Sequence, residues 1–185
     1  MSTVAPEKHV TAEEFLCLPD VEGRAELVRG KVIEMNPPGF KHGRICARIV
    51  YLLSVFLEER RLGRLVGNDA GVVTERGPDT VRGPDVAFYS YARLPQEQDP
   101  DGYPDVKPDL VFEVLSPGNR WPDVHRKIGE YLDVGVAVVC VLDSDSQKLH
   151  IYEAHHGGVE LSADDELTLP AVLPDLHIPV SRFFE

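Results

Sequence analysis

The sequence predicts an α/β domain built around a strand–helix–strand unit in residues 107–143. Residues 109–115 and 136–143 are apolar, β-branched runs of the kind that forms buried strands. Between them, apolar residues recur at helical spacing from about Pro122 to Asp133. Because the three elements follow one another directly, we expect a right-handed βαβ crossover.

Length and composition predict a single domain over residues 1–185. A chain of 185 residues with 43% hydrophobic content can bury a substantial core. No run approaches 18 uncharged apolar residues, and the N-terminal segment 1–15 lacks the apolar stretch of a signal peptide. We therefore expect a cytoplasmic protein that does not enter a membrane.

The first third of the chain predicts a short helix, a hairpin and a long helix. Thr11 and Glu14 have the spacing of a capping box at the start of a helix. Residues 25–28 and 31–35 read as strands joined by a two-residue turn, with Glu26 in the first and Glu34, expected on an exposed face, in the second. After a loop at 36–43, a helix is expected over 44–62, closed by Gly63.

The remaining elements are mostly strands. Residues 65–75 predict one strand interrupted by glycine, followed by a turn region at 74–84. Residues 81–90 predict a strand that carries Asp85. An acidic, proline-containing loop follows at 93–106. Finally, residues 147–153 predict a strand paired with 136–143, and the tail 169–185 is expected to dock on the sheet.

Charge argues against a simple nucleic-acid-binding protein, because the chain has a net charge of −12. The acidic excess lies entirely in residues 77–185. A basic patch remains open in the long helix, where Lys41, Arg44 and Arg48 share one face at helical spacing. The alternative is an ordinary solvated helix face.

Cysteine and histidine spacing predicts no zinc site. The three cysteines lie far apart in apolar runs, form no CxxC pair, and are expected to be packed thiols (Cys17, Cys46 and Cys140). The pair His155 and His156 lies in a glycine-flanked turn without a second pair of ligands.

Two carboxylates and one lysine form a candidate active site. Side chains alternate along a strand, so Asp109 and Glu113 share one face of strand 109–115. Lys127 lies at the edge of the apolar stripe of the following helix, from which it can lean inward. With Asp85, these groups suit metal-assisted phosphodiester hydrolysis, because Mg²⁺ takes oxygen ligands and an ammonium group can orient water or neutralise phosphate charge.

Three longer motifs resemble the Uma-two family of restriction endonucleases, in the PD-(D/E)XK nuclease superfamily. They are ELVRGKVIEMNPPGFKHGRI, VRGPDVAFYS and DLVFEVLSPGNRWPDVHRKIGEYLDVGV. The resemblance implies a restriction-endonuclease-like fold, with a mixed central sheet flanked by helices and an αβββαβ core. It also implies that Asp85 and Glu113 hold Mg²⁺, for which Mn²⁺ can substitute, and that Glu26 is an additional acid.

The chain departs from the superfamily pattern at the lysine. The expected position, two residues after the acid, holds Leu115, whereas Lys127 lies 14 residues after Glu113 and matches the helix lysine of this branch. The alternative is a structural lysine that pairs with Asp123 or with a core carboxylate. His42 also matches the family pattern, at the rim of the site.

Three functions follow from these observations. The first is a Mg²⁺-dependent DNA endonuclease, expected to be a homodimer because a two-fold arrangement presents two sites to two strands. The second is a nuclease-fold protein without activity that acts as a nucleic-acid-binding or regulatory module. The third is a small-molecule hydrolase that uses the same carboxylates.

Overall fold

The computed structural model describes residues 9–19 and 24–185. Residues 1–8, part of the segment predicted to lack a signal peptide, lie outside the described residues. Within the described ranges, none of the helices combines the length and the apolar character needed to cross a membrane.

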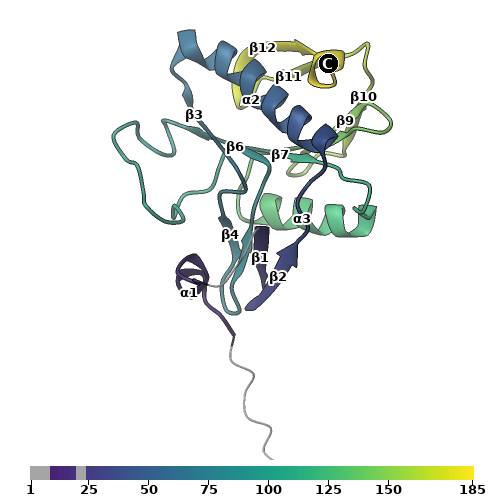
Figure 1. The fold of residues 1–185 in the computed structure, drawn as a ribbon. Coiled ribbons are helices and arrows are strands. Elements are labelled where there is room, and N and C mark those ends of the chain that lie inside the picture. Colours follow the sequence, from purple (N-terminus) through teal and green to yellow (C-terminus); the bar gives the residue numbers. More distant parts are fainter. Residues whose placement is uncertain (1–8, 20–23) are drawn as a thin grey trace, which may run out of the picture.

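A six-stranded sheet forms the centre of the fold (Figure 1). The central pair β7 and β8 is parallel and all other neighbours are antiparallel, so the sheet is mixed. Across the sheet, the strands are β10 (Val159–Leu161), β9 (Lys148–Glu153), β8 (Val138–Asp143), β7 (Leu110–Val114), β6 (Val86–Ser90) and β3 (Gly63–Gly67). Helix α3 (Trp121–Asp133) connects β7 to β8, which confirms the predicted βαβ unit.

Helices cover both faces of this sheet (Figure 1). On one face, Leu110 and Phe112 of β7 pack in a cluster with Ile45 and Ile49 of α2 (Phe40–Arg60). On the other face, Val111 belongs to a second cluster with the buried stripe of α3, which comprises Val124, Ile128 and Tyr131. The predicted alternation along this strand is therefore confirmed.

A four-stranded antiparallel sheet lies on the α3 side and brings the first hairpin to the central strands (Figure 1). Its strands, in order, are β2 (Lys31–Met35), β1 (Arg24–Val28), β5 (Thr80–Arg82) and β4 (Val72–Glu75). The turn residues Arg29 and Gly30 have φ of 49° and 76°, as a tight two-residue hairpin requires. Helix α1 (Ala12–Leu16) starts with the predicted capping box at Thr11 and Glu14.

The long helix starts earlier than the sequence predicts. Helix α2 begins at Phe40, not Arg44, and ends at Arg60, before Gly63. The prediction of a loop over 36–43 is therefore wrong for residues 40–43, which form the first turn of the helix. Gly43 lies inside the helix, where a Cβ would meet nothing within 4 Å. The helix ends through Arg61, which takes the left-handed conformation with φ of 50°.

The strands around Asp85 are divided differently from the prediction. The single strand expected over 81–90 is wrong, because its residues belong to β5 and β6, which lie in different sheets on either side of Asp85. Residues 65–75 contribute to two strands in two sheets, β3 and β4, because Asn68 and Asp69 both take positive φ and redirect the chain. The predicted turn region contains β5, where Thr80, Val81 and Arg82 are buried. The C-terminal tail forms β12 (Leu173–Pro179) and the 3₁₀ turn η1 (Val180–Phe183), and β12 pairs with β11 (Glu166–Leu169). This hairpin packs beside α2 on the central sheet.

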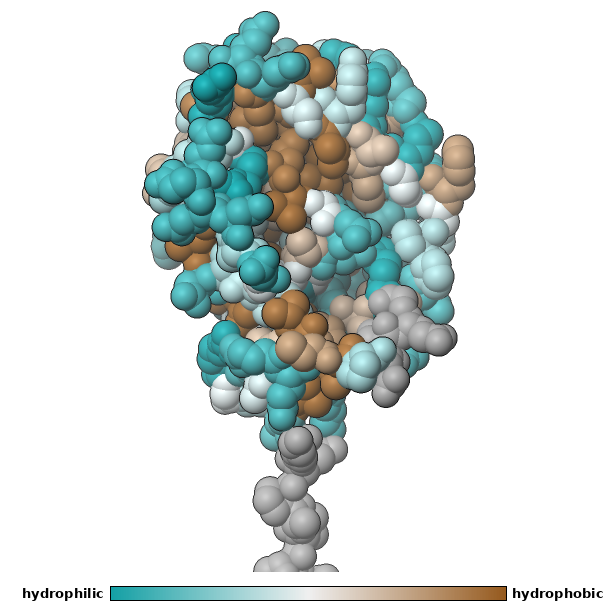
Figure 2. Space-filling view, turned by 60° about the vertical axis from the view of Figure 1, so that its left-hand side comes forward, coloured by the Kyte–Doolittle hydropathy of each residue, from teal (hydrophilic) through white to brown (hydrophobic). Residues whose placement is uncertain are grey.

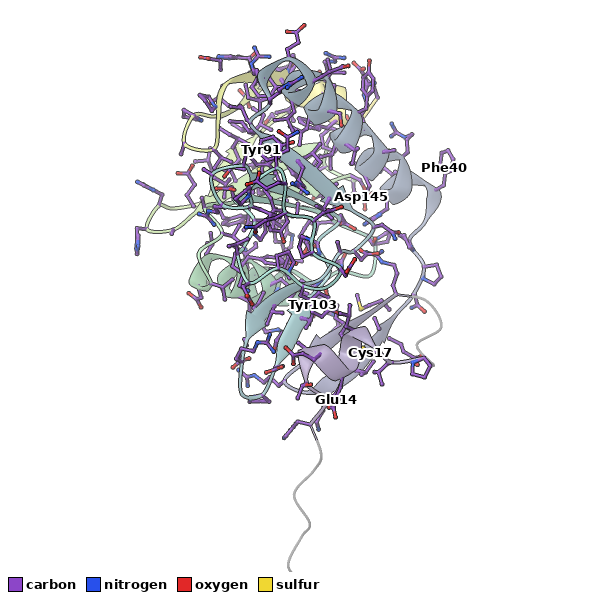
Figure 3. The ribbon with its side chains drawn as sticks, turned by 90° about the vertical axis from the view of Figure 1, so that its left-hand side faces the viewer. Glu14, Cys17, Phe40, Tyr91, Tyr103 and Asp145 are labelled. Carbon is purple, nitrogen blue, oxygen red and sulfur yellow. The ribbon has the colours of Figure 1, made fainter. Side chains whose placement is uncertain are left out.

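The cysteines are free, but only Cys140 is fully buried. Cys46 is half-buried, and the prediction of a packed thiol is wrong for Cys17, which is exposed. Helix α1 has five residues and buries only Ala12, so Cys17 at its C-terminal cap lies beyond the buried turn (Figure 3). The face shown in Figure 2 carries a patch of hydrophobic side chains in its upper middle, flanked by hydrophilic ones. Helix α2 exposes Phe40, Tyr51 and Val55.

Candidate active site

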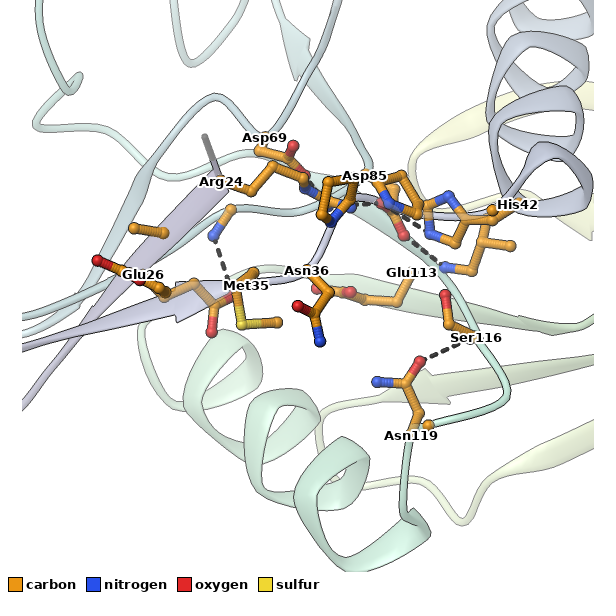
Figure 4. Close-up of a pocket in the computed structure, with 18 of the residues that line it drawn as sticks. Arg24, Glu26, Met35, Asn36, His42, Asp69, Asp85, Glu113, Ser116 and Asn119 are labelled. Carbon is orange, nitrogen blue, oxygen red and sulfur yellow. Dashed lines mark hydrogen bonds and ion pairs between the residues drawn. The ribbon is translucent and has the colours of Figure 1, made fainter. Parts of the chain in front are cut away.

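A pocket of about 420 Å³ opens between the β1–β2 hairpin, the start of α2 and the β7–α3 loop (Figure 4). Four side chains predicted for the active site line it, each from a different part of the chain: Glu26, Asp85, Glu113 and Lys127. Glu26 belongs to β1, Asp85 directly precedes β6, Glu113 lies in β7 and Lys127 in α3. The fold therefore brings together groups that are up to 101 residues apart.

Asp85 is held by both of its carboxylate oxygens. Oδ2 accepts a hydrogen bond of 2.7 Å from the backbone N–H of Val114 in the neighbouring strand. Oδ1 lies 3.2 Å from Nη2 of Arg24 and 3.2 Å from Nε2 of His42 (Figure 4). Arg24 also pairs with Asp69. These contacts fix the orientation of a carboxylate that is only 7% exposed.

The connection between β5 and β6 can lie close to Asp69 because residue 83 is glycine. A Cβ on Gly83 would lie 2.9 Å from Cβ of Asp69 and 3.0 Å from its carbonyl oxygen. Larger residues would therefore push apart the β5–β6 connection and the β3–β4 turn. In the sequence Arg82-Gly83-Pro84-Asp85, position 83 therefore requires glycine, and Asp85 follows two residues later.

Glu113 is the carboxyl group with the strongest perturbation in the pocket. Burial raises the pKa of Glu113 to about 7, the charge of Lys127 opposes this rise, and the charge of Asp85 adds to it. Tyr131 donates a hydrogen bond of 2.8 Å to Oε1. A half-buried acid with a pKa raised to near neutrality beside a second acid marks a site suited to a cation or a proton.

Lys127 points into the pocket from the edge of the apolar stripe, as predicted. Its Nζ donates a hydrogen bond of 2.7 Å to Oε1 of Glu26. Burial alone lowers the pKa of Lys127, but the charges of Glu113 and Glu26 outweigh burial and raise it. Of the two partners considered for a structural lysine, Asp123 pairs instead with Arg126, whereas a core carboxylate is present as Glu26, which is 6% exposed. Lys127 is therefore a charged ammonium group between two site carboxylates.

Arg82, which the sequence prediction did not assign to the site, binds the carboxylate oxygen of Glu26 that Lys127 does not contact. Arg82, 2% exposed, donates to Oε2 of Glu26 at 2.8 Å and to Oε2 of Glu130 at 2.5 Å. Burial by itself raises the pKa of Glu26, but Lys127 and Arg82 outweigh burial and lower it. The network keeps Glu26 ionised and leaves it less free than Glu113 to take a cation.

Asp109, which shares a strand face with Glu113, belongs to a different contact. Its Oδ2 accepts from the backbone N–H of Ser90 at 2.8 Å, and its Oδ1 lies 2.9 Å from Nε of Arg93. It ties the end of β6 to the following loop and does not line the pocket.

Like Arg82, the residues Tyr131 and Arg24 were missing from the predicted site. The spacing of Lys127 and Tyr131, four residues apart on one helix face, could have indicated Tyr131.

His42 lines the pocket from the first turn of α2, not from a loop as predicted. The basic residues predicted to share its helix lie outside the pocket. Lys41 pairs with Asp145 at 3.0 Å, Arg44 with the carbonyl oxygen of Glu185, and Arg48 with the carbonyl oxygen of Arg182 at 2.8 Å. These cations already have partners, which a nucleic acid would have to replace.

The donor set of the pocket fits a hard divalent cation. Asp85 and Glu113 provide carboxylate oxygens, the ligands that Mg²⁺ and Mn²⁺ prefer. Each carboxylate oxygen can accept at two positions, so the contacts of Asp85 leave room for a cation. Among the described residues, Glu113 has a hydrogen bond only at Oε1. Asp85 and Glu113 are thus the residues that could hold such an ion.

A mixed sheet between helices, with acids and a lysine gathered at one end, defines the restriction-endonuclease-like class of α/β fold. A crystal structure titled "putative nuclease belonging to DUF820 from Anabaena variabilis ATCC 29413" has this fold. It matches with a TM-score of 0.81 and 24% sequence identity over 95% of this chain and 97% of that chain. The chain belongs to the Uma2 family, described as "Putative restriction endonuclease", which it matches over residues 12–181. Comparison with curated proteins finds no match.

Proposed function

We propose that the protein is a Mg²⁺-dependent endonuclease that hydrolyses phosphodiester bonds of DNA, with Mn²⁺ able to replace Mg²⁺. One observation carries the proposal: Asp85, Glu113 and the ammonium group of Lys127 line one pocket, in which the pKa of Glu113 is raised to about 7. Membership of a family described as restriction endonucleases supports it.

Each side chain has a separate role in this proposal. Asp85 and Glu113 would hold the cation, which supplies Lewis-acid stabilisation of charge on the phosphate. Lys127 orients the attacking water or neutralises charge at the phosphate. Glu26 positions Lys127 through their 2.7 Å contact, and Arg82 in turn holds Glu26. Tyr131 fixes Oε1 of Glu113, so Oε2 would be the oxygen that binds the cation.

The surface for DNA and the assembly are part of the same proposal. Lys41, Arg44 and Arg48 of α2 would contact the phosphate backbone, exchanging their present partners for phosphates. A homodimer would present two sites to the two strands.

A second function is favoured by the position of the lysine. Leu115 stands where the superfamily carries its lysine, and the Nζ of Lys127 is engaged with Glu26. An inactive nuclease fold that binds nucleic acid would retain this pocket as a structural ion-pair network. It would bind DNA without cutting it.

Cleavage of supercoiled DNA in Mg²⁺ or Mn²⁺ separates the two functions. We expect cutting by the parent protein and a loss of at least about 100-fold in both Asp85→Asn and Glu113→Gln, because each removes a ligand charge. Glu58→Gln, an exposed carboxylate of α2 away from the pocket, is the matched control and should cut normally. DNA binding without cutting by the parent protein would instead support the inactive fold.

A further inference from the structure

One turn of α2 places a histidine and a cysteine against a carboxylate of the pocket. His42 and Cys46 are four residues apart and lie on the same side of the helix. Nδ1 of His42 is 3.4 Å from Sγ of Cys46, and Nε2 of His42 is 3.2 Å from Oδ1 of Asp85. One potential ligand atom from each residue lies within 4.8 Å of those of the other two.

We propose that His42, Cys46 and Asp85 form a binding site for a thiophilic divalent cation such as Zn²⁺, separate in chemistry from the Mg²⁺ site. Imidazole nitrogen, thiolate sulfur and carboxylate oxygen are the three ligand types that zinc uses in proteins. Zinc bonds of about 2.0–2.3 Å place tetrahedral ligand atoms about 3.3–3.8 Å apart. The three side chains, whose ligand atoms lie within 4.8 Å of one another, would therefore move closer and bind the ion through one nitrogen of His42. Three protein ligands leave the fourth tetrahedral position for water.

The surrounding charges favour a divalent cation. Arg24 stands between Asp69 and Asp85, so this guanidinium and the two carboxylates carry a net charge of −1. A thiolate at Cys46 makes the charge −2, which one divalent ion neutralises. Arg24 keeps Asp69 as its partner when Asp85 turns to the cation. Binding of the ion would displace the thiol proton of Cys46 into solvent.

The same geometry also has a reading without a cation. In that case the thiol of Cys46 donates to Nδ1 of His42, and the Nε2–H donates to Asp85, since an ionised carboxylate only accepts. Such a chain would orient Asp85 and require no metal. The two readings differ in whether the sulfur can bind a soft ion at low concentration.

Occupation of this site would have a consequence for catalysis. Asp85 belongs both to the thiophilic site and to the proposed Mg²⁺ site, so an ion held by His42 and Cys46 withdraws one of the two Mg²⁺ ligands. Zn²⁺ would therefore inhibit cleavage, and the inhibition would depend on Cys46. This consequence rests on the proposed nuclease function, whereas the binding itself does not.

The experiment uses Cd²⁺ as a spectroscopic probe, because a thiolate bound to Cd²⁺ gives a charge-transfer absorption band in the ultraviolet. The full chain is titrated in the presence of excess Mg²⁺, which thiolates do not bind. The matched variants are Cys46→Ser and Cys17→Ser, the second of which removes the exposed thiol. We expect one equivalent of Cd²⁺ to produce the band in the parent protein and in Cys17→Ser, and Cys46→Ser to lose it.

A second measurement keeps the test independent of the cysteine variant. Calorimetric titration with Zn²⁺ should show affinity at least about tenfold weaker in His42→Ala than in the parent protein, with unchanged far-ultraviolet circular dichroism. Absence of the band in the parent protein, or its persistence in Cys46→Ser, would overturn the proposal. Because neither readout needs activity, a protein that binds Cd²⁺ through Cys46 but never cuts DNA refutes the nuclease function alone.

Discussion

Replacing Glu113 by glutamine should make the protein more stable at alkaline pH. The perturbation removes a carboxyl group whose pKa burial raises from its ordinary value of 4.5 to about 7. Between these two pH values the folded protein holds a proton that the unfolded chain has lost, so the parent protein loses stability as pH rises. The glutamine side chain of the variant cannot ionise, and its amide oxygen can still accept the hydrogen bond from Tyr131.

The magnitude follows from the same shift. A pKa displaced from 4.5 to about 7, at about 1.4 kcal/mol for each pH unit, corresponds to about 3 kcal/mol. We therefore compare the free energy of unfolding of Glu113→Gln with that of the parent protein at each pH. The difference, variant minus parent, should be about 3 kcal/mol larger above pH 7 than at pH 4. Mg²⁺ should offset the loss in the parent protein at pH 8 and leave the variant unchanged, because ligand binding stabilises only a protein that retains the site.

The assay is urea unfolding at pH 4 to 8, with a chelator and then with Mg²⁺. Glu58→Gln, which removes an exposed carboxylate, is the control and should follow the parent protein at every pH. Parallel pH profiles of unfolding free energy for the parent protein and Glu113→Gln would refute the argument that Glu113 is a partly buried acid that destabilises the fold when it ionises without a cation.

Further expectations concern the lysine, its support, the basic helix face and the assembly. Lys127→Met should reduce cleavage by about 100-fold or more. It should lower the free energy of unfolding by only about 1–3 kcal/mol, because Arg82 still pairs with Glu26. A stable variant that cuts normally would remove Lys127 from the mechanism. Arg82→Met should cost about 3–5 kcal/mol, measured by urea unfolding, because it leaves Glu130 and part of Glu26 unpaired; a loss below about 1 kcal/mol would contradict this role. Simultaneous replacement of Lys41, Arg44 and Arg48 by alanine should weaken DNA binding and flatten its dependence on salt, and unchanged affinity in fluorescence anisotropy would exclude this surface. Light scattering should give the mass of a dimer, and a monomer at working concentration would contradict the expected homodimer.

The local sequence predicts those parts of the fold in which one periodicity dominates. The run 109–115 alternates cleanly between two buried faces, so its orientation and that of Glu113 could be predicted. The helical stripe around Lys127 was predicted for the same reason. The start of α2 was missed, because Gly39, Gly43 and the prolines before them give local turn signals that the helix overrides. The division of residues 81–90 into β5 and β6 was missed because the two strands belong to different sheets, which the alternation along the chain does not show.

The partners of the site residues could not be predicted, because ion pairs between distant segments leave no periodic signal. Nothing in the sequence around Arg82 shows that it would be buried between Glu26 and Glu130, 56 and 48 residues away. The approach of Cys46 to Asp85 likewise depends on how α2 crosses the end of the sheet. The site acids followed from strand position and family resemblance, whereas their charge balance required the structure.

The location of the divalent cation tests the central claim most directly. Crystals soaked in Mn²⁺ should show one anomalous scattering peak bonded to carboxylate oxygens of both Asp85 and Glu113, at a distance of about 2.0–2.2 Å. The same soak of Glu113→Gln should show no peak there. A peak in the parent protein that lacks Glu113 as a ligand, or no peak at millimolar Mn²⁺, would contradict the proposed active site.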